Sequence, residues 1–144
     1  MEKRSTLDEL FRSQRLGVLA TEGSGTPYTS LVAFAATEDL RHMLFVTDRH
    51  TNKYRNINHN PSVAILIDSR SNRVSDFSDA VAVTAIGRAV ECPEEEREKL
   101  AAVYTDKHPN LTDFITSSDS ALIRIEVSHY LIASFKETIQ VEPD

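Results

Sequence analysis

Three short apolar segments, separated only by brief polar turns, constrain the fold of this chain more than any other feature. Their positions are residues 16–20, 28–36 and 42–47. Glycines and a proline occupy the first turn, at residues 23–27, where they favour a reversal of the backbone. Because strands joined by turns this short run antiparallel, the pattern predicts a β-meander.

Two further strands, at residues 63–68 and 80–90, and three helices follow from the hydrophobic pattern. Gly87 lies inside the second of these strands and predicts a bulge or a close backbone approach. Near the C-terminus, residues 123–127 alternate between apolar and polar, and residues 130–135 either continue this strand or pair with it. The polar residues 69–78 are expected to form a loop, and residues 137–144 to fray.

The helices are expected at residues 6–15, 51–60 and 93–107, with one more helical turn at residues 111–116. A capping box formed by Thr6 and Glu9 would begin the first helix. Thr51 would cap the second, and Pro93 would lie in the first turn of the third.

These elements predict one fold class for the whole chain, residues 1–144. Strands come in consecutive blocks instead of alternating with helices, which favours an antiparallel barrel with peripheral helices over a parallel sheet. The length is that of one domain, and no repeat or interdomain linker is evident.

The charge balance excludes several classes of partner. With 16 Lys and Arg against 22 Asp and Glu, the net charge is −6, which argues against nucleic acid and against an anionic membrane surface. No segment approaches the roughly 20 apolar residues of a membrane span. The single cysteine, Cys92, excludes an internal disulfide and a multi-cysteine metal site. We expect a cytoplasmic protein, since no apolar signal region follows the N-terminal residues.

The densest chemical feature is a group of cations where the third strand ends and a helix begins. Arg49, Lys53 and Arg55, together with His50, face a single acid, Asp48. Unpaired N–H groups and a partial positive charge make a helix N-terminus suitable for a phosphate. The alternative is a solvated charged turn before a capped helix, and the sequence alone leaves both possibilities open.

No side-chain catalytic apparatus is evident elsewhere. The five histidines lack the i, i+4 spacing of a helical metal site, and Cys92 has no partner motif. Redox chemistry is still possible in such a chain if a cofactor supplies it.

The order of several motifs resembles a known family. A Gly-x-Pro-Tyr-x-Ser-Leu-Val segment precedes a Leu-Phe-Val-Thr strand, Thr51-x-Lys53, a helix and Asn-Pro-Ser-Val-Ala. Over roughly residues 7–135, the chain is similar to the pyridoxamine 5′-phosphate oxidase-like family of FMN-binding split barrels. The resemblance implies a six-stranded antiparallel split barrel that forms a homodimer, with two FMN molecules at the subunit interface.

By position, the resemblance also implies which residues contact FMN. Those along the flavin ring and ribityl chain would be Thr29, Ser30, Leu31 and Val32, with Val46 and Thr47 at the adjacent strand end. The phosphate would be held by Arg49, Thr51 and Lys53, and Asn72 would approach the flavin of the other subunit. No metal ligand and no catalytic side chain is implied.

Departures from the true pyridoxamine phosphate oxidases limit the activity. Those enzymes carry an Arg where this chain has Ser30, a Lys where it has Ala35, and an Arg where it has Asn52. Their C-terminal Trp has no match, since the chain contains no Trp. We therefore expect an FMN-dependent oxidoreductase that does not oxidise vitamin B6. NAD(P)H is a possible transient partner, although no Rossmann fingerprint is present.

Two other functions stay open at this point. A related barrel can bind a deazaflavin, or haem with His50 or His129 as axial ligand. The other is a flavin-binding module without catalytic activity.

Overall fold

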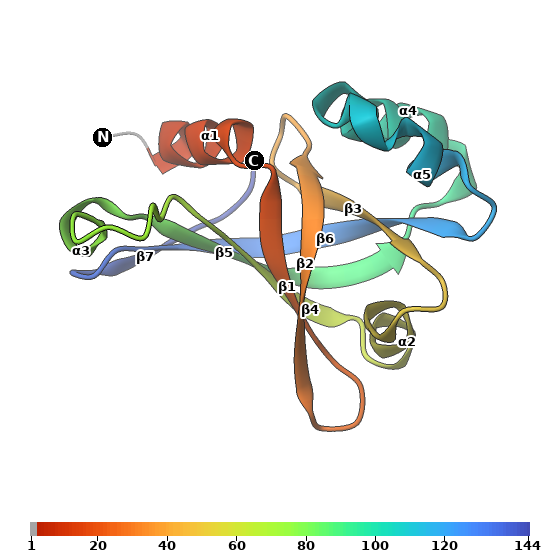
Figure 1. Cartoon of the computed structure of the whole chain (residues 1–144), viewed down its shortest axis with the longest axis horizontal. Helices are drawn as coiled ribbons and strands as arrows, with labels where there is room; N and C mark the ends of the chain where they lie inside the picture. Colours follow the sequence, from red (N-terminus) through yellow and green to blue (C-terminus); the bar gives the residue numbers. More distant parts are fainter. Residues whose placement is uncertain (1–2) are drawn as a thin grey trace.

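Within residues 3–144, seven strands form one antiparallel sheet that closes into a barrel (Figure 1). The computed structural model describes residues 3–144. The strands are β1 (Leu16–Glu22), β2 (Pro27–Ala36), β3 (His42–Asp48), β4 (Ser62–Asp68), β5 (Ala82–Glu91), β6 (Ser120–Ala133) and β7 (Thr138–Val141). Their order is β3-β2-β1-β4-β5-β6-β7, and β3 also pairs with β6, which closes a ring of six strands. The mainly β class and the six-stranded antiparallel barrel expected from the sequence are confirmed.

Helices lie around this barrel (Figure 1). They are α1 (Lys3–Ser13), α2 (Asn52–His59), α3 (Asp76–Asp79), α4 (Glu94–Lys107) and α5 (Thr112–Thr116), with a short 3-10 turn at Pro109–Leu111. In the figure α2 lies on the opposite side of the molecule from α3 and β7. The apolar stripe of α1, which is Leu7, Leu10 and Phe11, is buried against the main core.

Alternation along the strands creates that core. In β1, β4 and β5, buried residues alternate with partly exposed ones, as expected for strands with one face inward. Leu19, Phe34, Phe45 and Ile65 are fully buried in the main cluster. A second cluster lies beneath α4, around Leu44, Leu100, Tyr104 and Leu122.

The last long strand, β6, connects both parts of the sheet. Its first half pairs with β3 from Asp48↔Ser120 to His42↔Glu126, and its last residues pair with β7. Residues 130–133 therefore continue the strand. The expectation that residues 137–144 fray is wrong for Thr138–Val141, because this segment pairs with β6 and packs Ile139 and Val141 against the main core.

The prediction for Gly87 is confirmed in both of its forms. The register between β5 and β6 shifts at Ile86/Gly87, which marks a bulge. A Cβ atom at position 87 would overlap the main-chain oxygen of Glu126, so the strands approach too closely for any side chain.

Several predicted boundaries are wrong by a few residues. Helix α1 begins at Lys3, so Thr6 lies inside it and does not begin it. Pro93 is the N-cap of α4 instead of a residue of its first turn. The expected loop at residues 69–78 contains the start of α3, whose carboxylate Asp76 collects N–H groups of the loop.

Candidate functional site

A split between β2 and β3 is the main irregularity of the barrel wall. β2 pairs with β1 from Pro27 to Ala33, but with β3 only from Phe34 to Ala36. The N–H of Phe34 donates to the carbonyl of Arg15 on the β1 side, 3.2 Å away. Main-chain groups alternate between the two sides of a strand. The N–H and carbonyl groups that point toward the split are therefore those of Thr29, Leu31 and Ala33. This edge can offer hydrogen bonds to a ligand.

The hydroxyl of Tyr104, from α4, occupies the first position of the split. It donates to the carbonyl of Ala33 at 3.1 Å, and the N–H of Val46 donates to it. Tyr104 is 1% exposed. Burial raises the pKa of Tyr104 to about 12, against the opposing effect of the Val46 hydrogen bond. Tyr104 thus joins the two strands where their own pairing stops.

The four candidate residues of β2 divide between two faces. The side chains of Thr29 and Leu31 are exposed, and Leu31 retains 64% of its accessible surface. Val32 is buried in the core and Ser30 is partly buried, so both point inward. The Oγ of Ser30 is fully buried and has no hydrogen-bond partner among residues 3–144. A ligand at the split would therefore contact alternate side chains, not all four.

Val46 and Thr47 lie just before Asp48, the last residue of β3, and are both buried. The Oγ of Thr47 lies 2.8 Å from that of Thr51. Thr51 accepts from the N–H of Tyr54 at 3.3 Å, which confirms it as the N-cap of α2. Its hydroxyl also donates to the carbonyl of Asp48 at 2.9 Å. Both threonine hydroxyls thus fix the start of α2 beside the split.

Arg49 is held by the protein itself. Its guanidinium donates to the carbonyls of Ser118 and Ser120, at 3.1 and 2.9 Å, and pairs with Glu91. The hydrogen bond with Glu91 raises the pKa of Arg49, so the charge stays on the guanidinium. Tyr54 donates to the same carboxylate at 2.9 Å. The positive charge of Arg49 is therefore largely compensated.

Lys53 has a different environment in the first turn of α2. It is half-buried, and no acidic side chain of residues 3–144 pairs with it. The neighbouring cations are engaged locally: the ring of His50 lies 2.8 Å from the carboxylate of Asp48, and Arg55 donates to the carbonyl of His50 at 3.1 Å. Neither Lys53 nor Arg55 has an acidic partner among residues 3–144, but Arg55 is held by hydrogen bonds to His50 and Asn52, whereas the ammonium group of Lys53 makes none.

Asn72 lies apart from the other candidates, in the loop between β4 and β5. Its backbone is left-handed, with φ of 64°, and its N–H donates to Asp76 at 2.8 Å. Within one chain this loop and α2 lie on opposite sides of the molecule (Figure 1). A contact between Asn72 and a flavin of a second chain stays a prediction.

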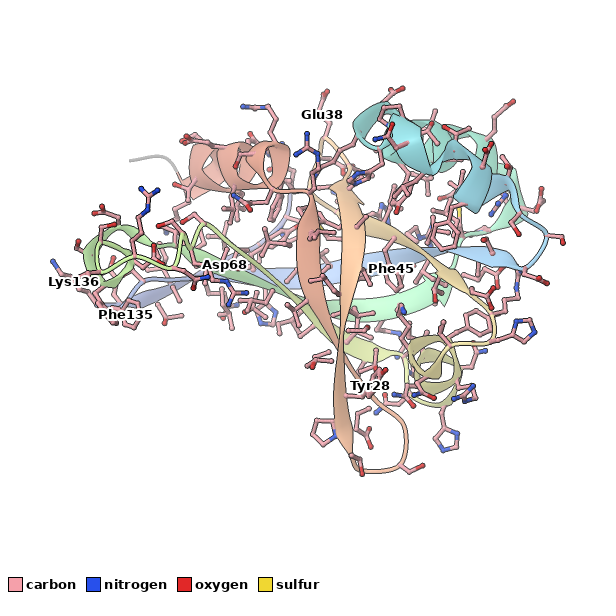
Figure 2. All side chains as sticks on the ribbon, in the orientation of Figure 1. Tyr28, Glu38, Phe45, Asp68, Phe135 and Lys136 are labelled. Atoms are coloured by element: carbon pink, nitrogen blue, oxygen red, sulfur yellow. The ribbon has the colours of Figure 1, made fainter. Side chains whose placement is uncertain are left out.

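The outer face of β1 and of the adjoining parts of β2 and β4 is apolar and partly exposed, whereas α4 packs on β2 further along, at Ala33 and Ala35. Val18 lies between Leu31 on one side and Leu66 on the other, and Leu16 is 50% exposed. Large apolar patches on a soluble protein mark interaction surfaces. Tyr28, labelled low in Figure 2, is also exposed, but it shares the face of Ser30 and Val32 and not that of Leu31.

The comparison with family profiles identifies this arrangement. The profile of the pyridoxamine 5′-phosphate oxidase family matches residues 4–132. The chain belongs to this family. The sequence resemblance is thereby confirmed. Among curated proteins no match was found.

Solved structures with this fold are similar over most of the chain. A heme binding protein from Mycobacterium smegmatis gives a TM-score of 0.85 at 19% identity over 99% of this chain, which spans only 59% of that protein. A FAD-binding protein from Mesorhizobium loti gives 0.71 at 17%, covering 92% of this chain and 94% of that one. A putative pyridoxamine 5′-phosphate oxidase from Listeria innocua gives 0.68 at 17%, covering 91% and 98%. At these identities the similarity shows the fold alone.

Within residues 3–144, no three His, Cys, Asp or Glu side chains gather where a metal ion could bind. Over the same residues, no helix has both the length and the apolar character needed to cross a bilayer.

Proposed function

We propose that this member of the pyridoxamine 5′-phosphate oxidase family binds FMN at the split between β2 and β3. The observation that carries the proposal is the unpaired edge of β2 beside the uncompensated charge of Lys53. A flavin ring needs hydrogen-bond partners along one edge, and a phosphate needs a positive site within reach. Both requirements are met on adjoining elements.

The residues present fit the cofactor. Main-chain groups of Thr29 and Leu31 face the split, and the buried hydroxyl of Ser30 lacks a partner among residues 3–144. An unsatisfied buried hydroxyl carries a free-energy cost that a ligand atom could relieve. Thr51 and Lys53 would hold the phosphate, with the N-terminus of α2 adding its partial positive charge. Arg49 would support the site indirectly, because its bonds to Ser118, Ser120 and Glu91 hold the end of β3 in place.

When bound, FMN would supply the electron transfer, and the chain would supply binding and orientation. We assign the protein as an FMN-dependent oxidoreductase of the cytoplasm. Its partner would be a small redox molecule or NAD(P)H, in transient contact with the flavin. Vitamin B6 phosphates are disfavoured as substrates, because Ser30 and Ala35 replace the basic side chains that the resemblance would require.

The apolar outer face supports a homodimer as part of this proposal. Leu16, Val18, Leu31 and Leu66 would be covered by a second chain, whose Asn72 could then approach the flavin. Replacing Leu31→Glu should convert a dimer into monomers in sedimentation velocity. A wild-type chain that sediments as a monomer at micromolar concentration would contradict this part.

Titration with FMN tests the central claim. We expect shifted flavin absorption bands and one FMN per chain. Replacing Lys53→Gln should weaken FMN binding by about 10-fold or more, which corresponds to a charge-assisted hydrogen bond of about 1.5–3 kcal/mol. The matched control is Lys99→Gln, an exposed lysine of α4. A protein that gains no flavin bands at saturating FMN would refute the proposal.

Activity requires a separate measurement. NADH or NADPH oxidation by the FMN-loaded protein, with several electron acceptors, should show turnover above that of free FMN. Stoichiometric FMN without turnover would favour the non-catalytic flavin-binding module. Binding of a deazaflavin in place of FMN would support the proposed position of the site and correct the identity of its cofactor.

Haem is a second candidate, because one similar structure is a heme binding protein and one histidine is suitably placed. His129 pairs in register with Ile86, which puts it on the apolar outer face, and its Nδ1 lies 2.9 Å from the Oγ of Ser128. His50, by contrast, is occupied by Asp48. A Soret band on haem titration that is lost in His129→Ala would favour this function over FMN.

A further inference from the structure

A cavity of about 590 Å³ lies between α1, α4 and the turn that joins β2 to β3. Figure 1 shows this turn between the two helices, and Figure 2 labels Glu38, one of its residues. The cavity reaches Ala35 and Ala36, where β2 is paired with β3, so it is separate from the split. We call it the α1–α4 cavity. Its volume falls within the range of roughly 300–1,000 Å³ that small-molecule sites occupy.

Lys107, in the last turn of α4, lines this cavity and has no acidic partner. Its Nζ donates to the carbonyl of Phe11 at 2.6 Å and lies 3.7 Å from the centroid of the Phe34 ring. The side chain is half-buried, and none of the ion pairs within residues 3–144 includes it. Burial, with a smaller effect of the Arg15 charge, lowers the pKa of Lys107 to about 8. A desolvated lysine of this kind is an activated nucleophile, because more of its amine is neutral.

The other charged side chains of the α1–α4 cavity leave it without an excess of positive charge. They are Arg4, Asp8 and Arg12 from α1, Glu38 from the turn, and Asp106 from α4. Two cations therefore face three carboxylates when Lys107 is neutral, which disfavours an anionic ligand. The apolar part of the wall, which can accept an aliphatic chain, consists of Phe11, Ala35, Ala36, Leu40 and Val103.

We propose that the α1–α4 cavity binds a small uncharged aldehyde and that Lys107 joins it as an imine. The neutral Nζ attacks the carbonyl carbon and forms a C–N bond, and one N–H proton passes to the carbonyl oxygen, which gives a carbinolamine. The carbinolamine takes up one proton, loses water and becomes a protonated imine, so no atom is oxidised or reduced. The exposed carboxylates of Glu38 and Asp106 can relay these protons.

The contacts of Nζ favour this adduct over an acylated lysine. A protonated imine keeps one N–H for the carbonyl of Phe11 and a positive charge beside the ring of Phe34. An amide would keep the N–H but lose the charge, and with it the cation–π attraction. The site needs no flavin, and it stands whether or not the chain binds FMN.

Reductive trapping on the full chain tests the proposal. Cyanoborohydride delivers hydride to the imine carbon and makes the adduct permanent, and peptide mass spectrometry compares Lys107 with Lys99, an exposed lysine of the same helix. At pH 7 a lysine with a pKa of about 8 is roughly a tenth neutral, against less than about one part in a thousand for an ordinary lysine. We expect butanal, which is uncharged, to label Lys107 at least about tenfold faster than Lys99, with a rate that saturates. Glyoxylate, an aldehyde with a carboxylate, should show a smaller preference for Lys107.

Two variants of α4 separate the cavity from the reactivity of the amine. Val103→Phe enlarges a side chain that lines the cavity and leaves Lys107 in place, so labelling of Lys107 should slow by about fivefold or more. The matched control, Ala102→Phe, adds a ring on the exposed side of the helix and should leave labelling within about twofold. Near-ultraviolet circular dichroism confirms that each variant folds.

Four results would overturn the proposal. The first is equal labelling of Lys107 and Lys99 by butanal. The second is labelling of Lys107 that rises linearly with butanal concentration or is unchanged in Val103→Phe, since Lys107 would then be a reactive side chain without a binding cavity. The third is a stronger preference of glyoxylate for Lys107, which would exclude an uncharged ligand. The fourth is protection of Lys107 by saturating FMN, because the lysine would then belong to the flavin site.

Discussion

Removing the hydroxyl oxygen of Tyr104 tests whether this side chain stabilises the barrel where β2 and β3 separate. Tyr104→Phe keeps the ring in the core beneath α4 and deletes the hydroxyl that joins Ala33 to Val46. Two main-chain groups then lose their partner at a buried position. The substitution creates almost no cavity, so the hydrogen bonds dominate the effect.

The magnitude follows from those two groups. A typical intramolecular hydrogen bond contributes about 0.5–1.5 kcal/mol net, and a buried group left unsatisfied costs about 1–3 kcal/mol. Since water can enter the open part of the split and solvate one of the groups, we expect the free energy of unfolding to fall by about 2 kcal/mol. Amide exchange at Val46 should accelerate more than exchange at Phe45, whose strand pairing is intact.

Urea denaturation of wild type, Tyr104→Phe and the control Tyr54→Phe measures this difference. The hydroxyl of Tyr54 bonds to the exposed carboxylate of Glu91 and lies beside the partly exposed guanidinium of Arg49, so the control should lose less than about 1 kcal/mol. An equal loss in both variants, or unchanged amide exchange at Val46, would refute the reasoning. The split would then be held open by packing alone.

Three further predictions concern other positions. Gly87→Ala should lower the free energy of unfolding by about 2–4 kcal/mol in urea denaturation, because its Cβ meets main chain; Gly25→Ala, with φ of 86° and open space around it, should lose only about 1 kcal/mol. Lys107 has its pKa lowered from 10.5 to about 8, chiefly by burial, so the unfolded chain binds more protons above pH 8. The free energy of unfolding should therefore rise between pH 8 and 9.5, by about 1 kcal/mol after solvent screening, and Lys107→Met should abolish the rise. Arg49→Gln should lower the midpoint of urea denaturation while weakening FMN less than Lys53→Gln does, in titrations run side by side.

Local signals in the sequence were sufficient where the structure depends on neighbouring residues. The strand expected at residues 42–47 is observed as His42–Asp48, because four consecutive apolar residues there are buried. Thr51 was predicted as an N-cap from its place before a helical pattern, and its hydroxyl does accept the N–H of Tyr54. The bulge at Gly87 followed from a glycine inside a strand. In each case the deciding interaction lies within a few residues or within the backbone itself.

Interactions between distant residues were beyond the sequence patterns. β7 has four residues, too few for a clear pattern, and it is ordered by pairing with β6 and by the packing of Ile139 and Val141 against the main core. Arg49 belonged to a cluster of cations in the sequence, but its partner Glu91 lies on another strand. Tyr104 could be recognised as an apolar position of a helix, although nothing in its neighbourhood indicated that its hydroxyl reaches the β2–β3 split. A buried aromatic residue with a polar end was the one available signal.

The pairing that closes the barrel affects how the chain is made. β3 must pair with β6, as His42 does with Glu126, yet most of the chain lies between them. While the ribosome is still synthesising α4, the β3 edge has no partner and is available to other nascent chains. Contacts this distant in sequence also slow folding relative to a chain of local hairpins. The synthesis of β6 therefore determines when the edge of β3 is protected from aggregation.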